Sequence, residues 1–333
     1  MSHILNSIED FKSDVIEGLV RAYPQFLERI ENAHGVRAVG VPFDGKVSIL
    51  IGGGSGHYPA FAGLVGDGLA SGAVIGEIFT SPSSEQVYRC TKALDGGAGV
   101  IYSYGNYSGD VMNFDMAAAR AEQDGITVRT VLVTDDVASA PADRVSQRRG
   151  IAGDFCVFKI LGAAARAGRS IEDVTELGAR ANSRTRTIGI AFGGCTVPGA
   201  TDPMFNVEKG KMELGLGIHG EPGIRSVNRA DARYLARMLV NAVVSEAPSG
   251  ADGRVAVLVN GLGSTTYEEL FVLYGEIAPL LKDADLPVHH CEVGELVTSL
   301  DMAGCSLTLL WLDDELSVLY DEPAVAAGYR KVV

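Results

Sequence analysis

Short apolar runs that end in glycine-rich turns alternate with longer amphipathic stretches along most of this chain. That alternation is typical of βα units built on sheets that are at least partly parallel. The run Val47–Ile51 leads directly into GGGSGHYPAFAG, while Gly99–Tyr104 and Thr127–Thr134 lead into the loops GNYSGD and DDVASA. We therefore predict an α/β fold that carries its functional loops at one edge of a sheet.

The pattern of the chain changes after residue 184. Strand-like runs become more frequent there, at TIGIAF, KMELGLGI, RVAVLVN and SLTLLWL, with hairpin-like turns nearby. A chain of 333 residues also exceeds what one hydrophobic core usually serves. We expect two closely packed α/β domains, residues 1–183 with a mainly parallel sheet and residues 184–333 with a mixed sheet. Whether the last segment packs back on the first domain is left open.

Composition and charge exclude several classes of partner. The formal net charge is −14 and no basic run interrupts it, so nucleic acid and membrane surfaces are not expected partners. The five cysteines are widely spaced without a CxxC pair, which favours reduced thiols over a zinc site. The N-terminal region lacks the features of a signal peptide, and no run approaches about 18 apolar residues. We expect a soluble, cytoplasmic protein.

The segment Gly215–Gly220, GLGIHG, matches the GxGxxG pattern of dinucleotide-binding folds. It is followed by EPG, which would break the helix whose N-terminus has to bind the pyrophosphate. Phosphate-loop patterns fail as well, because neither Lys46 nor Lys211 is followed by Ser or Thr. The sequence therefore predicts no nucleotide site in this chain.

Of the six histidines, only His57 and His219 lie in glycine-dense loops directly after strand-like runs. That position predicts an exposed imidazole, with glycines that let a substrate approach the backbone. A structural role in the turn is an equal alternative for each of the two. The other four histidines lie in the N-terminal region or in a strand-like run, where packing or surface roles are favoured.

The acidic residues near the predicted loops have two interpretations each. Asp110 ends the loop GNYSGD and could be a general acid or base, or it could interact with the dipole of a helix that we expect to begin at Asn113. For Asp115 the helix role is favoured. Asp135 and Asp136 could bind Mg²⁺, although paired acids after a strand more often form a solvated turn or a cap. No metal site is predicted.

Five motifs occur along the chain in a fixed order. They are GGGSGH at 52–57, GEIFTSPS at 76–83, NYSGDVMNF at 106–114, GGCTVPG at 193–199 and GIHGEPGI at 217–224. As a set they resemble the dihydroxyacetone kinase family, specifically its K subunit or K domain, and the similarity spans nearly the whole chain. The resemblance implies two α/β domains in each subunit, a homodimer, and a ketose site between the domains.

The resemblance also implies a set of site residues. In that family the histidine of the HGEPG motif forms a hemiaminal with the substrate carbonyl, and here it is His219. The motif histidine His57 and the motif aspartate Asp110 would handle protons. The substrate would further contact the loop before His57 through three residues: Gly54, Ser55 and Gly56.

Elementary chemistry agrees with these implied roles. A neutral imidazole can add to a carbonyl when a neighbouring acid protonates the developing alkoxide. Addition selects ketones and aldehydes over polyols, and it positions one hydroxymethyl group for phosphoryl transfer. Asp110 or His57 could then take the proton of that hydroxyl.

The phosphoryl donor is expected on another component. In the family the nucleotide lies on a helical L domain, which is fused after the K domain or carried on another chain. The sequence ends a few residues after its last strand-like segment, so we expect a separate L-type subunit as partner. The donor would be ATP with Mg²⁺ on that partner, or bound ADP that a phosphotransferase-system protein recharges. No cofactor is expected in this chain.

One departure from the family pattern concerns the substrate. Many members carry Lys directly before the Asn-Tyr of the NY(S/T)GD motif, where it contacts the substrate, whereas this chain has Gly105. Loss of the long cationic side chain leaves space and removes a hydrogen bond. A four-carbon ketose such as erythrulose, or its phosphate, is therefore an alternative to dihydroxyacetone.

A non-catalytic sensor is the alternative from another functional class. Such a protein would bind a ketose and report it to a transcription factor. The presence of His57, Asp110 and His219 together favours the enzyme, because binding alone needs no acid and base set.

Overall fold

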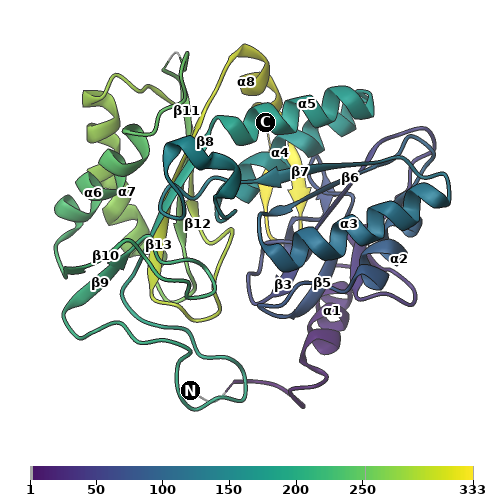
Figure 1. Cartoon of the computed structure of the whole chain (residues 1–333), viewed down its shortest axis with the longest axis horizontal. Coiled ribbons are helices and arrows are strands. Elements are labelled where there is room, and N and C mark those ends of the chain that lie inside the picture. The colour runs from purple at the N-terminus through teal and green to yellow at the C-terminus, as the bar shows by residue number, and fades with distance from the viewer. Residues whose placement is uncertain (1–2, 252, 333) are drawn as a thin grey trace. The chain divides into compact units, whose positions relative to one another are not determined.

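Most strands among the described residues belong to two six-stranded sheets, one in each of two units (Figure 1). The computed structural model describes residues 3–251 and 253–332. Unit 1 comprises Thr134–Cys156 and Ala181–Ser317, and unit 2 comprises His3–Val133, Val157–Arg180 and the C-terminal segment from Val318. Two sheet-containing α/β units agree with the fold class that the sequence predicts.

The division of the chain differs from the single boundary expected at residue 184. The segment that follows the first sheet belongs to unit 1, because Asp136 forms a parallel β-bridge with Thr187. The C-terminal segment belongs to unit 2, where Val325 pairs with Asp67. Long-range strand pairing, which chain order does not reveal, therefore sets the boundary.

Unit 2 contains the mainly parallel sheet predicted for the N-terminal half. The strands of this sheet are β1 (Leu27–Arg29), β2 (Gly35–Ala38), β3 (Ser48–Ser55), β5 (Gly72–Ile78), β6 (Val100–Gly105) and β7 (Val128–Val133). Their order is β1-β2-β5-β3-β6-β7. β3 pairs in parallel with β5 and β6, and β6 with β7, while β1 and β2 are antiparallel. A separate small sheet joins β4 (Gly66–Asp67), β14 (Ala324–Ala326) and β15 (Arg330–Lys331).

The helices of unit 2 bury large aromatic and aliphatic side chains against its strands. They are α1 (Phe11–Ala22), the short helix η1 (Ala62–Leu64), α2 (Ser84–Leu94), α3 (Ser108–Gln123), and most of α4 (Gly153–Arg166) and α5 (Ile171–Ser183). α2 and α3 lie side by side (Figure 1). Phe114 of α3 is fully buried and stacks on Tyr104 of β6, with ring centroids 4.1 Å apart. This contact fixes the start of α3 beside the end of β6.

Unit 1 contains the mixed sheet predicted for the C-terminal half. Its strands are β8 (Thr185–Ala191), β9 (Lys211–Leu214), β10 (Arg225–Asn228), β11 (Val255–Gly261), β12 (Val288–Gly294) and β13 (Gly304–Trp311). Their order is β10-β9-β8-β13-β11-β12, and only β11 and β12 pair in parallel among the described residues. The helical elements are η2 (Ala142–Gln147), α6 (Ala232–Val244), α7 (Tyr267–Asp283) and the first half of α8 (Asp314–Asp321).

One hydrophobic core joins α6 and α7 to this sheet. Leu239 of α6 and Ile277 of α7 lie in the same buried cluster as Val257 of β11 and Leu307 of β13. All four side chains are excluded from solvent. The core fixes the sheet of unit 1, and with it the ends of β9 and β10 that hold the loop GIHGEPGI.

Two predicted boundaries near the functional loops were wrong. α3 begins at Ser108 rather than at Asn113, so Asp110 lies in its first turn instead of at the end of a loop. Three small residues, Ser108, Gly109 and Asp110, form this turn, where an acidic side chain interacts favourably with the helix dipole. β3 also continues to Ser55 rather than ending at Ile51, because its glycines stay paired with β5.

None of the helices among the described residues combines the length and the apolar character that a membrane span requires.

Candidate active site

Two of the predicted loops lie at one edge of the sheet of unit 2. β3 ends at Ser55, and the neighbouring parallel strand β6 ends at Gly105. Because the carboxyl ends of parallel strands meet at the same edge, the turn with His57 and the helix start with Asp110 both begin there. This matches the placement expected from the sequence. His219 lies on a loop of unit 1.

The glycines of β3 leave room for neighbouring backbone and rings. A Cβ on Gly52 would lie 2.6 Å from Val74, and one on Gly53 would lie 2.5 Å from the ring of Phe61. A Cβ on Gly54 would lie 2.6 Å from the amide nitrogen of Thr80. Side chains at these positions would collide with their neighbours, so the GGG run has a packing requirement beside any contact with a ligand.

Ser55 ends β3 with a buried hydroxyl. Its Oγ has no hydrogen-bond partner among the described residues. A buried polar atom without a partner costs free energy unless water or a ligand satisfies it. The next residue, Gly56, has φ of +104°, a conformation that favours glycine and turns the chain toward His57. Ser55 therefore offers a hydrogen bond at the edge where the substrate is expected.

The side chain of His57 is buried, with only 2% of its surface exposed. The expectation of an exposed imidazole was therefore wrong for this residue. Its ring stacks on Phe79 at 5.0 Å between centroids and meets the edge of Phe61 at 6.3 Å. Both phenylalanines have a positive φ, 53° for Phe79 and 67° for Phe61, and residues other than glycine rarely adopt this conformation. Such strain clusters at functional sites, where the surrounding structure holds it in place.

Asp110 is nearly buried in the first turn of α3, with 9% of its surface exposed. Tyr104 lies near it at the end of β6. Burial raises the pKa of Tyr104, and the negative charges of Asp115 and Asp110 raise it further. Its hydroxyl therefore keeps its proton at neutral pH, and this buried hydroxyl has no hydrogen-bond partner among the described residues. Sequence patterns gave no signal for Tyr104.

Gly105 is the last residue of β6 and pairs with Val133 of β7. It is buried, and its carbonyl accepts a hydrogen bond of 2.8 Å from the N–H of Tyr107. The position that carries Lys in many family members thus lies at the end of β6, and only Asn106 and Tyr107 separate it from Ser108, where α3 begins.

His219 lies on the loop between β9 and β10, and about 21% of its side chain is exposed. Its Nδ1 lies 2.9 Å from Oε1 of Glu221, and its backbone N–H donates to Oε2 of the same carboxylate at 3.0 Å. One carboxylate therefore holds both the ring and the backbone of this histidine. The carbonyl of Ile218 accepts a short hydrogen bond from Ser299, which anchors the loop to the chain after β12.

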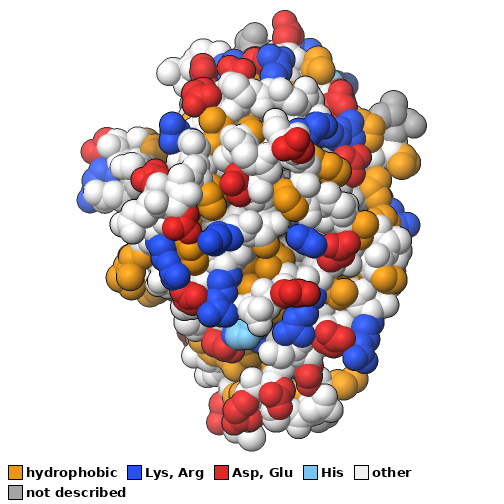
Figure 2. Space-filling view, turned by 90° about the vertical axis from the view of Figure 1, so that its right-hand side faces the viewer, with side chains coloured by type: hydrophobic (Ala, Val, Ile, Leu, Met, Phe, Trp, Pro, Cys, Tyr) orange, Lys and Arg blue, Asp and Glu red, His pale blue; other side chains and the backbone are white. Residues whose placement is uncertain are grey.

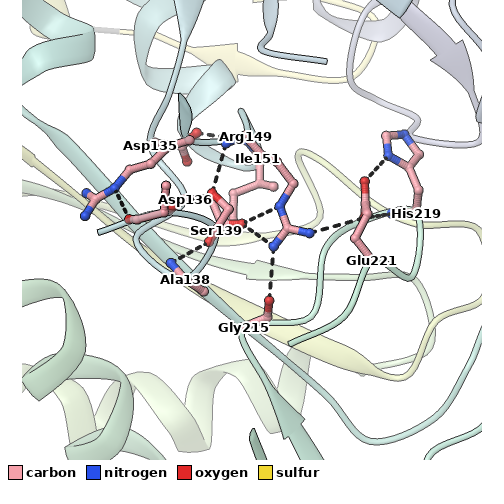
Figure 3. A network of polar contacts seen from close by, with 11 residues as sticks. Asp135, Asp136, Ala138, Ser139, Arg149, Ile151, Gly215, His219 and Glu221 are labelled. Carbon is pink, nitrogen blue, oxygen red and sulfur yellow. Dashed lines mark hydrogen bonds and ion pairs between the residues drawn. The ribbon is translucent and has the colours of Figure 1, made fainter. Parts of the chain in front are cut away.

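The carboxylate of Glu221 continues into a chain of charged contacts (Figure 3). Nη1 of Arg149 lies 3.8 Å from Oε2 of Glu221, and Nη2 of Arg149 lies 2.8 Å from Oδ2 of Asp136. Arg149 also donates to the carbonyl of Gly215 at 3.2 Å. Burial would raise the pKa of Glu221, but the hydrogen bond and the charge of His219, a backbone hydrogen bond and the charge of Arg149 together lower the pKa to about 2. Glu221 is therefore a carboxylate at neutral pH.

Asp135 and Asp136 are buried groups with structural partners. The expectation of a solvated turn was wrong, because both side chains are at most 1% exposed. Asp135 accepts hydrogen bonds from the N–H groups of Ile151 and Gly153 at 2.8 and 2.7 Å, at the start of α4. Asp135 therefore caps the start of α4, which was one of the alternatives considered for the paired acids. Burial raises the pKa of Asp136 to about 6 even though Arg149 acts in the opposite direction. Among the described residues, no group of three or more His, Cys, Asp or Glu side chains could hold a metal ion.

The glycines of GLGIHG also serve packing. The loop leads into strand β10 and not into a helix, as its EPG sequence predicts. A Cβ on Gly217 would lie 2.1 Å from Oε2 of Glu221 and 2.6 Å from Nη1 of Arg149. Gly217 thus leaves the space that the Glu221 carboxylate occupies. The motif contains Glu221 but does not reveal its contacts with His219 and Arg149. Arg149 gives no signal in the sequence, because its contact with Glu221 joins distant parts of the chain.

The Dak1 domain model matches residues 17–328. L-erythrulose 1-kinase of Mycolicibacterium smegmatis is 49% identical over 99% of this chain and 58% of that protein. The dihydroxyacetone-binding subunit DhaK of PTS-dependent dihydroxyacetone kinase 1 of Listeria innocua is 44% identical, over 95% of both chains. The chain thus spans less than three fifths of the erythrulose kinase and nearly all of the DhaK subunit.

Solved structures agree with these relatives. The crystal structure of the dihydroxyacetone kinase of C. freundii matches with a TM-score of 0.90 and 32% identity, over 99% of this chain and 60% of that one. The dihydroxyacetone kinase operon co-activator DhaQ matches with a TM-score of 0.89 and 32% identity, over 96% of this chain and 98% of that one. The same fold therefore occurs in a kinase and in a regulator.

Proposed function

The chain belongs to the dihydroxyacetone kinase family through its Dak1 domain, and from this premise we propose that it is the ketose-binding component of a small-ketose kinase. The proposal rests on one observation, the different exposure of the imidazoles of its two motif histidines. The imidazole of His219 is partly exposed on a loop, where a carbonyl can reach it, whereas that of His57 is buried between aromatic rings. Nucleophilic addition requires such access.

In this proposal, one motif histidine captures the ketone, while the other histidine and the motif aspartate handle protons. His219 adds to the carbonyl carbon and forms the hemiaminal. Asp110, with His57, protonates the developing alkoxide and later takes the proton of the hydroxymethyl group that is phosphorylated. The remaining contacts to the ketose are assigned to the β3 and β6 ends: Gly54, Ser55, Gly56 and Gly105.

The hydroxyl of Ser55 has no hydrogen-bond partner among the residues that the structure describes, and this supports its assignment to a ketose hydroxyl. A four-carbon ketose is the substrate that we favour, alongside dihydroxyacetone. Three relatives at 47–49% identity are named as erythrulose kinases, whereas the relatives named as dihydroxyacetone-binding subunits are 37–44% identical. Gly105 supports the same preference, since it has no side chain to fill the space of an extra hydroxymethyl group.

The phosphoryl donor in this proposal is bound by an L-type component. It delivers the phosphoryl group either from ATP with Mg²⁺ or from bound ADP that a phosphotransferase-system carrier recharges. A cytoplasmic homodimer of the ketose-binding component completes the assignment.

The proposal is tested by mixing the purified chain with erythrulose or dihydroxyacetone and a phosphoryl donor, with and without a cognate L-type protein. We expect phosphorylated ketose only when the L-type protein is present. The same mixture with the His219→Ala variant should remain inactive. Steady turnover without the L-type protein, or stoichiometric ATP binding to the chain measured by calorimetry, would refute the division of labour.

A co-activator function is the second candidate, because the DhaQ structure matches the chain over nearly the full length of both. A co-activator needs ketose binding but no proton transfer. The kinase is favoured because Asp110 is retained in the first turn of α3, at the edge where His57 also lies. Ketose binding without phosphorylation by any L-type protein would support the co-activator instead.

A further inference from the structure

We propose that Glu221 and Arg149 are positioning residues that hold the imidazole of His219 with its proton on Nδ1, so that Nε2 carries the lone pair which adds to the ketose. The inference rests on the proposed function for its catalytic consequence. The position of the ring proton is inferred only from contacts within unit 1 and does not depend on the proposed function.

The contact between the ring and the carboxylate decides which nitrogen is protonated. Nδ1 of His219 lies 2.9 Å from Oε1 of Glu221. An ionised carboxylate only accepts hydrogen bonds, so Nδ1 has to donate. In a neutral imidazole the proton on Nδ1 leaves the lone pair on Nε2. The nitrogen that points away from the carboxylate is therefore the nucleophile.

The second oxygen of the carboxylate keeps Glu221 from rotating. Oε2 accepts the backbone N–H of His219 at 3.0 Å and faces Nη1 of Arg149 at 3.8 Å. Both oxygens are thus engaged, one by the ring and one by the backbone of the same histidine. Figure 3 shows Glu221 between His219 and Arg149. The positive charge of Arg149 also favours the ionised form of the carboxylate.

Arg149 is itself held by buried groups. Its Nε and Nη2 donate to Oδ2 of Asp136 at 3.0 and 2.8 Å, and Nη2 also lies 3.2 Å from the carbonyl of Gly215. The side chain of Asp136 is 1% exposed, so this ion pair is shielded from solvent. A guanidinium held by two hydrogen bonds to one carboxylate has little freedom to leave Glu221.

The carboxylate also balances the charge that addition creates. When Nε2 forms its bond to the carbonyl carbon, the π pair of the C=O bond moves to oxygen and is protonated by the acid of the site. The imidazole, still protonated on Nδ1, becomes a cation. Glu221 faces that proton and stabilises the cation, as the carboxylate of a catalytic triad does for its histidine.

Glu221→Gln tests the inference by a predicted inversion of the ring. The backbone N–H of His219 can only donate, so the amide oxygen of Gln should face it and the NH₂ group should face Nδ1. Nδ1 would then accept, and the ring proton would move to Nε2. Nitrogen-15 NMR of the imidazole in the ketose-free protein reports this directly. We expect Nδ1–H in the natural chain and Nε2–H in Glu221→Gln, with covalent ketose capture slowed at least about tenfold.

The chain offers a matched control in Glu292→Gln. His290 and Glu292 have the same spacing as His219 and Glu221, and their side chains lie 2.8 Å apart. This control removes an equivalent carboxylate from unit 1 and should leave both the tautomer of His219 and ketose capture unchanged.

A second variant keeps the inference falsifiable if Glu221→Gln does not fold. Gly217→Ala places a methyl group where the ends of the Glu221 and Arg149 side chains now lie, and it should also slow capture. Its control is Gly275→Ala on α7, where an added Cβ meets no atom within 4 Å. Equal capture rates in Gly217→Ala and Gly275→Ala would overturn the inference.

The outcomes separate this inference from the proposed function. A natural chain with Nε2–H, or a Glu221→Gln variant with an unchanged tautomer, overturns the positioning. Unchanged capture despite an inverted ring overturns its catalytic consequence. A ring that inverts as expected in a protein that captures no ketose supports the positioning and overturns the proposed function.

Discussion

The two motif histidines lie in different surroundings in the two units. In unit 1, His219 is partly exposed and bonded to a carboxylate that is itself bonded to Arg149. In unit 2, His57 is buried and packed between the rings of Phe61 and Phe79. A charged hydrogen bond fixes which ring nitrogen bears the proton, whereas stacking fixes the plane of the ring. The first arrangement suits a nucleophile, and the second suits a residue that shapes the site or exchanges protons.

The face of the molecule in Figure 2 shows no separation of charge types that would mark this difference. The space-filling view shows acidic and basic side chains interspersed with apolar ones across the face that it presents (Figure 2). The difference between His219 and His57 lies in the contacts beneath the surface, and substitutions are needed to measure the effect of each contact.

The largest expected effect is a loss of turnover that leaves covalent capture of the ketose in place. Asp110→Asn keeps the shape of the first turn of α3 but removes the base, so turnover with the L-type partner should fall at least about a hundredfold. Covalent capture on His219 should persist at equilibrium, although more slowly. His57→Ala should also reduce turnover. Steady-state rates under saturating partner and ketose give the comparison, and near-normal turnover in both variants would place the chemistry elsewhere.

The second effect contrasts the glycines of the two units. The obstacle to a Cβ on Gly54 is backbone, the segment Phe79–Thr80, whereas the obstacle on Gly217 is the ends of two long side chains, which can shift at the cost of their hydrogen bonds without moving the backbone. Gly54→Ala should therefore lower the free energy of unfolding by about 1–3 kcal/mol, and Gly217→Ala by clearly less. Urea unfolding of both variants measures this. Equal losses would show that packing does not distinguish the two loops.

The third effect concerns the charged contacts of unit 1. The folded-state pKa of Asp136 is about 6, above the ordinary value of 3.8, so this group contributes stability that is present below pH 4 and lost as the pH rises through 6. The stability of the natural chain relative to Asp136→Asn should fall by roughly 2 kcal/mol between pH 4 and pH 7. Chemical denaturation at both pH values tests it. A pH-independent difference would mean that Asp136 titrates normally in the folded chain.

The smallest expected effect is on substrate choice and involves unit 2. Gly105→Lys restores the long side chain found in many family members and should shift the ratio of kcat/KM for erythrulose over dihydroxyacetone by about tenfold toward dihydroxyacetone. Both ketoses are assayed with the same L-type partner. If the natural chain strongly prefers dihydroxyacetone and Gly105→Lys leaves the ratio unchanged, other residues close the pocket.

Local sequence patterns predicted the fold class well, but they gave wrong element boundaries where tertiary packing overrides local preference. Apolar runs such as Val47–Ile51 identified the strands, since burial on both faces selects such sequences. The glycines after Ile51 were interpreted as a turn because glycine in a strand is normally destabilising, and only the close approach of Val74, Phe61 and Thr80 explains them. The assignment of Asp136 to unit 1 depends on pairing with a distant strand.

The candidate site was predictable to the extent that its residues lie in short motifs. His219, His57, Asp110 and Ser55 fall within them, but burial of His57 depends on Phe61 and Phe79, whose positive φ values no pattern reveals. Arg149 reaches Glu221 across a long stretch of chain, so its role appears only in the folded structure.

The central claim is covalent capture of a ketose on His219, and carbon-13 NMR of erythrulose labelled at its carbonyl tests it most directly. On addition of the natural chain, we predict that a stoichiometric share of the carbonyl signal moves to the region of a tetrahedral carbon bonded to oxygen and nitrogen. The His219→Ala variant, verified as folded, should leave only the free ketone and its hydrate. A tetrahedral signal that persists in His219→Ala, or its absence from the natural chain at saturating erythrulose and dihydroxyacetone, would contradict the account.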